Sequence, residues 1–156
     1  MTNFIGEYEV KLDAKGRFSF PAGLRKQLSL LSQGKFVVNR GLEDCLVLYQ
    51  QEDWERISEK VNKLNQLVKK NRMFVRRFNN GATAVDLDAS GRLNLPKRLM
   101  GYADISKNCV LFAYGDKIEI WSAERYNAMM SEDDAEDYAG LAEDVMGDLN
   151  DANDVS

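Results

Sequence analysis

Histidine is absent from this chain of 156 residues. The sequence therefore lacks the side chain that most often serves as a general base or a metal ligand near neutral pH. It also contains no G-x-S-x-G nucleophile elbow, no Walker-type phosphate loop and no cysteine cluster with metal-ligand spacing. We therefore expect a protein that is not an enzyme and that uses no cofactor, no metal and no small-molecule substrate.

Cysteine and long apolar runs are also scarce. Cys45 and Cys109, the two cysteines, lie in apolar, strand-like runs, which favours buried thiols over a disulfide and fits a reducing compartment. No segment approaches the ~20 apolar residues of a membrane span, and the first ten residues lack the basic-then-apolar pattern of a secretion signal. We expect a cytoplasmic protein that does not contact a membrane.

Basic residues are missing from the last thirty positions. Residues 127–156 carry ten acidic residues and no lysine or arginine, whereas residues 1–126 carry all 21 cations and 15 acids. The net charge of −4 thus conceals a basic body and an acidic tail. The composition of residues 127–156 predicts a solvated, disordered tail.

The body contains an internal duplication. Residues 6–25 recur 75 positions later as residues 81–100, and nine of the twenty aligned positions are identical, including both prolines of the chain. A weaker similarity at an offset of 72 relates residues 45–49 to residues 117–121. Two repeats of about 70 residues follow from this pattern.

Residue alternation predicts strands at the start of each repeat. In the first copy, residues 7–12 alternate in character, with Tyr8, Val10 and Leu12 expected to face inward. Asp13 and Gly16 occupy the first and fourth positions of a turn, so we expect a hairpin whose second strand is residues 17–20. Pro21 then opens a short helix that extends to about Leu28.

A second hairpin and a longer helix complete the repeat. Residues 36–39 and 45–49 are the expected strands, and apolar residues recur at helical spacing after them, at Trp54, Ile57, Val61, Leu64 and Leu67. Residues 69–80 read as a further helix whose apolar residues, Met73, Phe74, Val75 and Phe78, need burial against a neighbour.

The predicted fold class is α+β, mainly β, built from a duplicated strand–strand–helix–strand–strand–helix unit. We divide the chain into one duplicated domain, 1–126, and the acidic tail, 127–156. The domain comprises repeat one (4–68), a connector helix (69–80) and repeat two (81–126).

The candidate binding residues lie beside the two predicted turns. Arg17 and Arg92 follow Asp13 and Asp88 by four positions, and alternation places both arginines on the exposed side of their strands. Gly16 and Gly91, together with the two aspartates, are expected to structure the loops. Arg17 has two interpretations, a binding residue or a structural partner of Asp13. An exposed ion pair stabilises the folded protein by only about 0 to 1 kcal/mol. Stability alone therefore explains poorly why both repeats have an arginine at this position.

Other cations are candidates of lower rank. Arg25, Lys26, Lys97 and Arg98 fall in the helices that follow the two prolines, where a solvated helix face explains each of them. The densest basic run, between positions 69 and 77, favours subunit packing or solvation over DNA contact.

These motifs resemble the MraZ family. The resemblance rests on a strand, the D-x-x-G-R core, an aromatic or aliphatic pair, a proline and a short helix, all present twice, with GLEDCLVLY and EDW between the copies. It covers about Phe4 to Tyr126. It implies an AbrB-like swapped-hairpin barrel with flanking helices, in which two repeats supply what two chains supply in AbrB-like dimers. It also implies a nucleoid-associated transcriptional regulator of the bacterial division and cell-wall gene cluster. Such a regulator binds direct repeats in double-stranded promoter DNA as a ring-shaped homo-oligomer.

By position in the family motif, the resemblance implies that the functional pairs are Asp13 with Arg17 and Asp88 with Arg92. Lys15 and Arg25 match basic positions close to the first pair, and the second copy has Ser90 and Met100 in their place. The resemblance thus makes the first copy the stronger candidate for DNA contact. Two alternatives stay open: a ring-forming scaffold that uses the same barrel, and a tail that either aids solubility or competes with DNA for the basic surface.

Overall fold

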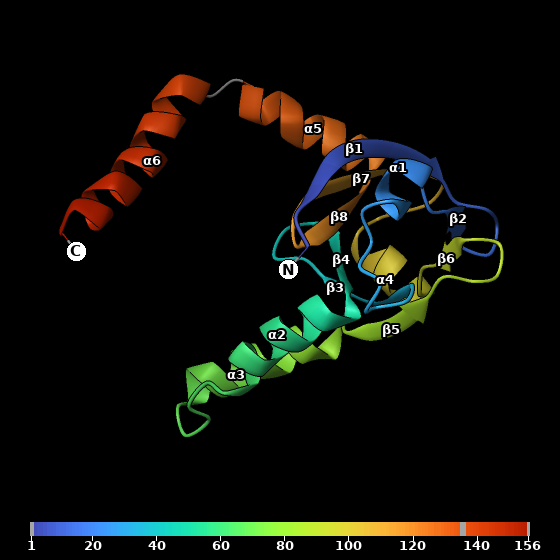
Figure 1. Cartoon of the computed structure of the whole chain (residues 1–156), viewed down its shortest axis with the longest axis horizontal. Coiled ribbons are helices and arrows are strands. Elements are labelled where there is room, and N and C mark those ends of the chain that lie inside the picture. Colours follow the sequence, from blue (N-terminus) through green and yellow to red (C-terminus); the bar gives the residue numbers. More distant parts are fainter. Residues whose placement is uncertain (1, 135–136, 156) are drawn as a thin grey trace. The chain divides into compact units, whose positions relative to one another are not determined.

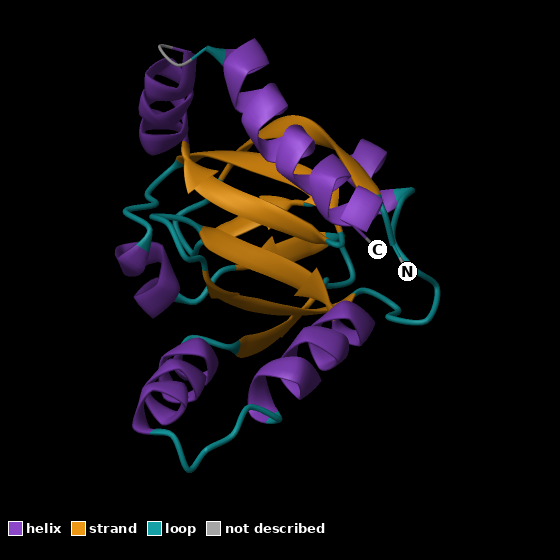
Figure 2. Ribbon diagram, turned by 90° about the vertical axis from the view of Figure 1, so that its left-hand side faces the viewer, coloured by secondary structure: helices purple, strands orange, loops and turns teal. Residues whose placement is uncertain are grey.

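The structure is a computed structural model that describes residues 2–134 and 137–155. It contains two compact units, Met1–Ala123 and Glu124–Ser156, which are described separately below. The first unit is a sheet structure flanked by short helices (Figures 1 and 2). Its elements are β1 (Phe4–Lys11), β2 (Arg17–Ser19), α1 (Ala22–Arg25), β3 (Lys35–Arg40), β4 (Leu46–Gln50), α2 (Gln51–Asn62), α3 (Lys69–Asn80), β5 (Thr83–Asp86), β6 (Arg92–Asn94), α4 (Lys97–Tyr102), β7 (Asn108–Gly115) and β8 (Lys117–Ser122).

The order of the strands reflects the duplication. Six strands form one sheet in the order β1-β7-β8-β4-β3-β5, and β2 pairs with β6 in a separate two-stranded ribbon. Each strand of repeat one has a counterpart in repeat two: β1 and β5, β2 and β6, β3 and β7, β4 and β8. Replacing every strand by its counterpart gives the same two orders, read from the opposite end. The strand–strand–helix–strand–strand unit therefore occurs twice, and the two copies are related by a pseudo-twofold axis between β4 and β8 and between β2 and β6.

The predicted first hairpin is wrong in its pairing. The chain does turn at Asp13–Gly16, but β1 pairs with β7 of the other repeat, and β2 pairs with β6. The second hairpin is confirmed, because β3 and β4 pair antiparallel. Sequence alternation locates strands but does not specify which other strand each one pairs with. The exchange between repeats, in which β1 and β2 pair with strands of the other repeat, could therefore not be predicted from it.

The fold class α+β, mainly sheet, is confirmed. Strand pairing among the described residues divides the strands into a six-stranded sheet and a two-stranded ribbon. The closed swapped-hairpin barrel implied by the resemblance stays a prediction.

Both repeats contribute to one hydrophobic core. Phe18 and Phe20 of the first repeat and Leu93 and Leu95 of the second are almost fully buried, as the predicted alternation required. Phe18 lies directly opposite Leu93 in the β2–β6 ribbon, so the inner side of the ribbon is anchored by side chains from both copies. This packing holds the ribbon rigidly against the rest of the unit.

The two cysteines are buried and free, as expected. Burial raises the pKa of each thiol to about 12. Neither thiol is therefore a reactive thiolate at neutral pH.

Helices α2 and α3 form a pair that projects from the sheet and is joined at its far end by residues 63–68 (Figure 1). The predicted connector helix, 69–80, is confirmed with the same bounds. Helix α2 ends at Asn62, so Leu64 and Leu67 lie beyond it, and α1 ends at Arg25 rather than near Leu28.

The pair is held by aromatic contact. The rings of Trp54 on α2 and Phe78 on α3 stack with centroids 5.3 Å apart. The predicted burial of the apolar residues of α3 is incomplete, since Met73 and Phe74 each remain 43% exposed.

The second unit contains α5 (Ala123–Asp134) and α6 (Tyr138–Val155). These two helices cover most of residues 127–156. The disordered tail expected from their composition stays a prediction. Tyr138, Leu141 and Val145 recur at helical spacing and are exposed. No helix in the described part of the chain is both long enough and apolar enough to span a membrane.

Candidate nucleic-acid interface

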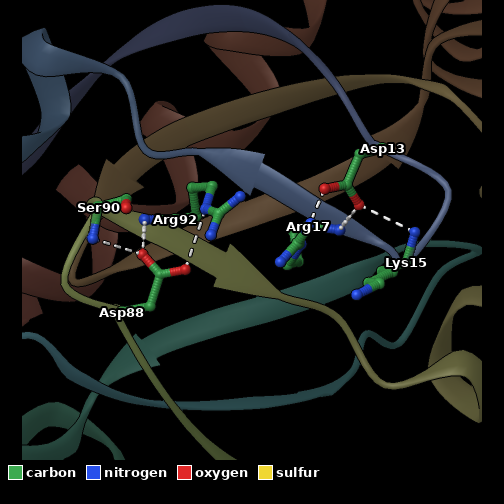
Figure 3. Close-up of polar contacts among 6 residues, drawn as sticks. All are labelled: Asp13, Lys15, Arg17, Asp88, Ser90 and Arg92. Atoms are coloured by element: carbon green, nitrogen blue, oxygen red, sulfur yellow. Dashed lines mark hydrogen bonds and ion pairs between the residues drawn. The ribbon is translucent and has the colours of Figure 1, made fainter.

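The first candidate loop is organised by the carboxylate of Asp13. Its Oδ1 atom accepts hydrogen bonds from the backbone N–H groups of Lys15 (2.9 Å) and Arg17 (3.0 Å), and its Oδ2 atom accepts one from Nε of Arg17 (2.8 Å) (Figure 3). The backbone N–H of Asp13 donates to the carbonyl of Arg17, and that of Gly16 donates to the carbonyl of Asp13. One carboxylate therefore sets both the backbone of the loop and the direction of the arginine.

The second loop repeats this arrangement. Asp88 accepts hydrogen bonds from the N–H groups of Ser90 and Arg92, both at 2.9 Å, and its Oδ2 atom lies 3.0 Å from Nε of Arg92 (Figure 3). The ion pair expected between Arg17 and Asp13 is therefore present, and Arg92 forms the same pair with Asp88. The ion pair uses one of the five N–H donors of each guanidinium.

Hydrogen bonding also shifts the ionisation of the two aspartates. The backbone hydrogen bond from Arg17 is the main cause that lowers the pKa of Asp13, and the one from Arg92 does the same for Asp88. Both carboxylates are thus charged throughout the physiological pH range.

Gly16 and Gly91 connect each loop to the opposite repeat. Their φ angles are 84° and 76°, in the left-handed region that glycine adopts readily. The carbonyl of Gly16 accepts a hydrogen bond from the N–H of Leu95, and the carbonyl of Gly91 accepts one from Phe20. The two loops are therefore fixed to each other through crossed backbone contacts.

The β2–β6 ribbon presents four polar side chains on its outer side. Arg17 is paired with Asn94, and Ser19 with Arg92, while Phe18 and Leu93 between them face the core. Figure 3 shows Arg17 and Arg92 on this ribbon, between the two aspartates. Arg17 and Arg92 keep about a third of their side-chain surface exposed.

The exchange between repeats also corrects the predicted position of Arg25. A β-carbon on Gly91 would lie 2.5 Å from Nη1 of Arg25, so this side chain covers the second loop rather than the first. In the same way, a β-carbon on Gly16 would lie 3.0 Å from Sδ of Met100. Each helix that follows a proline thus covers the loop of the other repeat.

The exchange between repeats also changes which cations lie at each loop. The first loop carries Lys15 and Arg17, and the second carries Arg92 with Arg25 beside it. The second loop, which has Ser90 in place of Lys15, thus has a cation from the other repeat beside it. The stronger role of the first copy in DNA contact stays a prediction.

Sequence reasoning did not assign a role to Asn94, which the ribbon places opposite Arg17 on the outer side. The available signal was its alternation with the buried Leu93 and Leu95. Lys15 is exposed at the tip of its loop, as expected.

The similarity to known proteins follows the same duplication. The sequence model of the MraZ family, described as MraZ protein, matches residues 3–77 and again residues 78–148. The chain belongs to the MraZ family. The resemblance carried by the doubled motif is thereby confirmed, and the MraZ match extends beyond it into the acidic segment.

Curated MraZ relatives cover nearly the whole chain. "Transcriptional regulator MraZ" of Christiangramia forsetii is 45% identical over 148 residues, which is 94% of this chain and 95% of that protein. Proteins of the same name from Flavobacterium psychrophilum and Cytophaga hutchinsonii are 43% and 40% identical, over 97% and 90% of this chain and 96% and 92% of their own lengths.

Proposed function

We propose that this protein is a sequence-specific DNA-binding transcriptional regulator that binds direct repeats in promoter DNA of the bacterial division and cell-wall gene cluster. The names of its relatives support regulation of transcription. The observation that carries DNA contact is the β2–β6 ribbon, on which Arg17 and Arg92 face outward, each held by an aspartate. Its location would be the cytoplasm, at the nucleoid.

A two-stranded ribbon is one of the two elements that the major groove of B-DNA admits. Arginine can donate two hydrogen bonds to O6 and N7 of guanine, and asparagine can pair with adenine through N6 and N7. Arg17, Arg92 and Asn94 would supply these contacts, and Lys15 and Arg25 would approach phosphates. Because the aspartates already hold the arginines, little side-chain freedom is lost on binding.

A single chain offers few cations to DNA, so it should bind weakly. A ring-shaped homo-oligomer would present the ribbon many times, and repeated DNA sites of matching spacing would then raise the effective concentration of each contact. We include such a ring in the proposal for this reason.

A second function is favoured by the two ion pairs themselves. Arg17 and Arg92 have intramolecular partners, so they can be structural residues of a scaffold or protein-interaction module. The two functions respond differently to salt. DNA affinity should fall linearly in a plot of log K against log salt concentration, whereas a scaffold assembled by apolar packing should persist.

The test compares Arg17→Ala, Arg92→Ala and the double variant by fluorescence anisotropy with promoter DNA and with a scrambled duplex. Each single substitution should weaken specific binding about tenfold, with a larger loss in the double variant. Lys26→Ala, which removes an exposed cation outside both loops, is the matched control. Unchanged specific binding in the double variant, with the assembly size intact, would rule out the ribbon as the DNA-contacting surface.

A further inference from the structure

The two repeats differ at one pair of equivalent positions on the outer side of the β2–β6 ribbon. Arg17 and Arg92 are equivalent in the two copies and identical. Ser19 of the first copy, however, corresponds to Asn94 of the second, and both are exposed. Because the two arginines offer DNA the same donors, a difference in base choice between the two halves of the ribbon depends on Ser19 and Asn94.

Each arginine lies opposite one of these two residues in the antiparallel ladder. The N–H of Leu95 donates to the carbonyl of Gly16, one position beyond the pair of Arg17 with Asn94. Hydrogen-bonded and non-hydrogen-bonded pairs alternate along such a ladder, so Arg17 and Asn94 form a non-hydrogen-bonded pair. The β-carbons of directly opposed residues are about 4.5 to 5.5 Å apart, and they are closer in pairs of this kind. Arg17 and Asn94 therefore present their side chains as neighbours.

The side-chain amide of Asn94 is available for binding. Among the residues that the structure describes, none hydrogen-bonds to this amide. A β-carbon on Gly16 would lie 3.6 Å from Oδ1 of Asn94, which places the amide beside the first loop. An asparagine amide has two N–H donors and one carbonyl acceptor. The ribbon thus carries, next to Arg17, a group that can donate and accept hydrogen bonds at once.

Arg17 keeps the donors that recognise guanine. Asp13 accepts a hydrogen bond from Nε of Arg17, which leaves the Nη1 and Nη2 groups as donors. An arginine can donate two hydrogen bonds to O6 and N7 of guanine. Neighbouring base pairs of B-DNA are about 3.4 Å apart along the helix axis. The side chains of one cross-strand pair can therefore reach two adjacent base pairs, the first through Arg17 and the second through Asn94.

Asparagine and serine differ in how strictly they select a base. An asparagine amide accepts a hydrogen bond from N6 of adenine and donates one to N7, and this pattern is unique to adenine in the major groove. A serine hydroxyl forms contacts with either kind of base edge. The half of the ribbon that contains Asn94 is therefore selective at a base pair where the half that contains Ser19 is not.

We propose that Asn94 and Ser19 determine the base specificity of the ribbon. Asn94 selects an A·T base pair next to the guanine that Arg17 contacts. Ser19 leaves the base pair next to the guanine that Arg92 contacts unselected. This inference rests on the proposed DNA-binding function and adds to it the residue difference that decides which bases are read.

The first experiment uses a set of promoter duplexes in which each base pair of one repeat is replaced in turn. Their affinities for the full chain and for Asn94→Ser are measured by competition fluorescence anisotropy. Replacing the selected A·T pair should weaken binding of the parent chain about tenfold, and so should 7-deazaadenine there, because it lacks N7. In Asn94→Ser both penalties should fall below about twofold, while the penalties at the guanines remain.

The second experiment transfers the preference. Ser19→Asn should create a new A·T preference of about tenfold next to the guanine that Arg92 contacts. Combined with Asn94→Ser, it should keep this new preference and lose the original one, a result that damage to the fold cannot produce. Asn80→Ser, at an exposed position on α3 outside the ribbon and both loops, is the matched control and should keep every preference of the parent chain.

Three outcomes would contradict the proposal. If Asn94→Ser weakens binding to every duplex equally, Asn94 is a phosphate-contacting or structural residue. If the combined variant and the parent chain share the same base preferences, base selection lies elsewhere, and the DNA-binding function still stands provided that Arg17→Ala lowers specific binding. If the parent chain binds promoter and scrambled duplexes equally, both the proposed function and this inference are wrong.

Discussion

At the scale of single residues, Gly16 and Gly91 are positions where the backbone tolerates substitution poorly. Alanine at either would have to adopt a positive φ angle, and at Gly16 its β-carbon would also press on Met100. We expect each substitution to lower the free energy of unfolding by about 1 to 3 kcal/mol. Urea denaturation followed by circular dichroism measures this change.

Gly101→Ala is the matched control for these variants. Gly101 lies in α4, has no positive φ angle, and a β-carbon there meets no atom within 4 Å. Alanine should therefore stabilise the protein slightly, by up to about 1 kcal/mol. Equal destabilisation at all three glycines would contradict the special role of the loops.

Asp13 and Asp88 predict a pH dependence of stability. Their pKa values are lowered in the folded state by backbone hydrogen bonds, so folding favours the charged form. The resulting stabilisation is complete above the ordinary aspartate pKa of about 3.9 and is lost as the pH falls through the lowered folded-state pKa. Carboxyl ¹³C chemical shifts should show both groups titrating below that ordinary value.

The double variant Asp13→Asn, Asp88→Asn checks the assignment. Between pH 5 and pH 2 its stability should fall less steeply than that of the parent chain, as measured by urea denaturation at each pH. An identical acid response in the two proteins would place the responsible carboxylates elsewhere.

Residue-scale features of the loops were largely predictable from the sequence. The D-x-x-G-R core encodes its own turn, because the carboxylate, the glycine and the arginine lie within five positions and interact locally. Arg25 was misplaced for the opposite reason. Its contact with Gly91 spans 66 positions and depends on the exchange between repeats.

At the scale of elements, the α2–α3 pair depends on few contacts with the sheet. Its main internal contact is the stack of Trp54 on Phe78. We expect Phe78→Ala to cost about 1 to 3 kcal/mol of local stability and to speed hydrogen exchange across residues 51–80, with the sheet strands β7 and β8 unchanged. Hydrogen exchange read by mass spectrometry separates the two regions.

Arg76→Ala, at an exposed position on the same helix, is the control for that variant and should leave exchange close to that of the parent chain. If Phe78→Ala accelerates exchange equally in β7 and β8, the helix pair and the sheet form one cooperative unit instead.

Element types were predicted better than element partners. The predicted bounds of α3 are those of the structure, and the β3–β4 hairpin followed from two strand patterns separated by a short turn. Leu64 and Leu67 continued the apolar spacing of α2 by coincidence, because helix α2 ends at Asn62. The pairing of β1 with β7 joins strands about a hundred residues apart, and no local pattern specifies such a contact.

At the scale of the whole molecule, the crossed strand pairing implies that neither repeat folds alone. A fragment of residues 1–80 would lack the partners of β1 and β2, which are β7 and β6. We expect this fragment and residues 81–156 to be unfolded or aggregated when separate. Mixed or co-expressed, they should form a complex with the circular dichroism spectrum and size of the parent chain. A folded, monomeric 1–80 fragment would contradict the exchange.

The duplication allows the two loops to differ in a way that a dimer of identical chains cannot. In such a dimer every substitution occurs twice, and the twofold axis suits palindromic sites. Here Lys15 corresponds to Ser90, and Met100 corresponds to Arg25, so one end of the ribbon is chemically distinct from the other. A surface with two distinct ends has a direction. Molecules seated on successive direct repeats would then all point the same way along the DNA, so the binding site itself would have a defined upstream and downstream side.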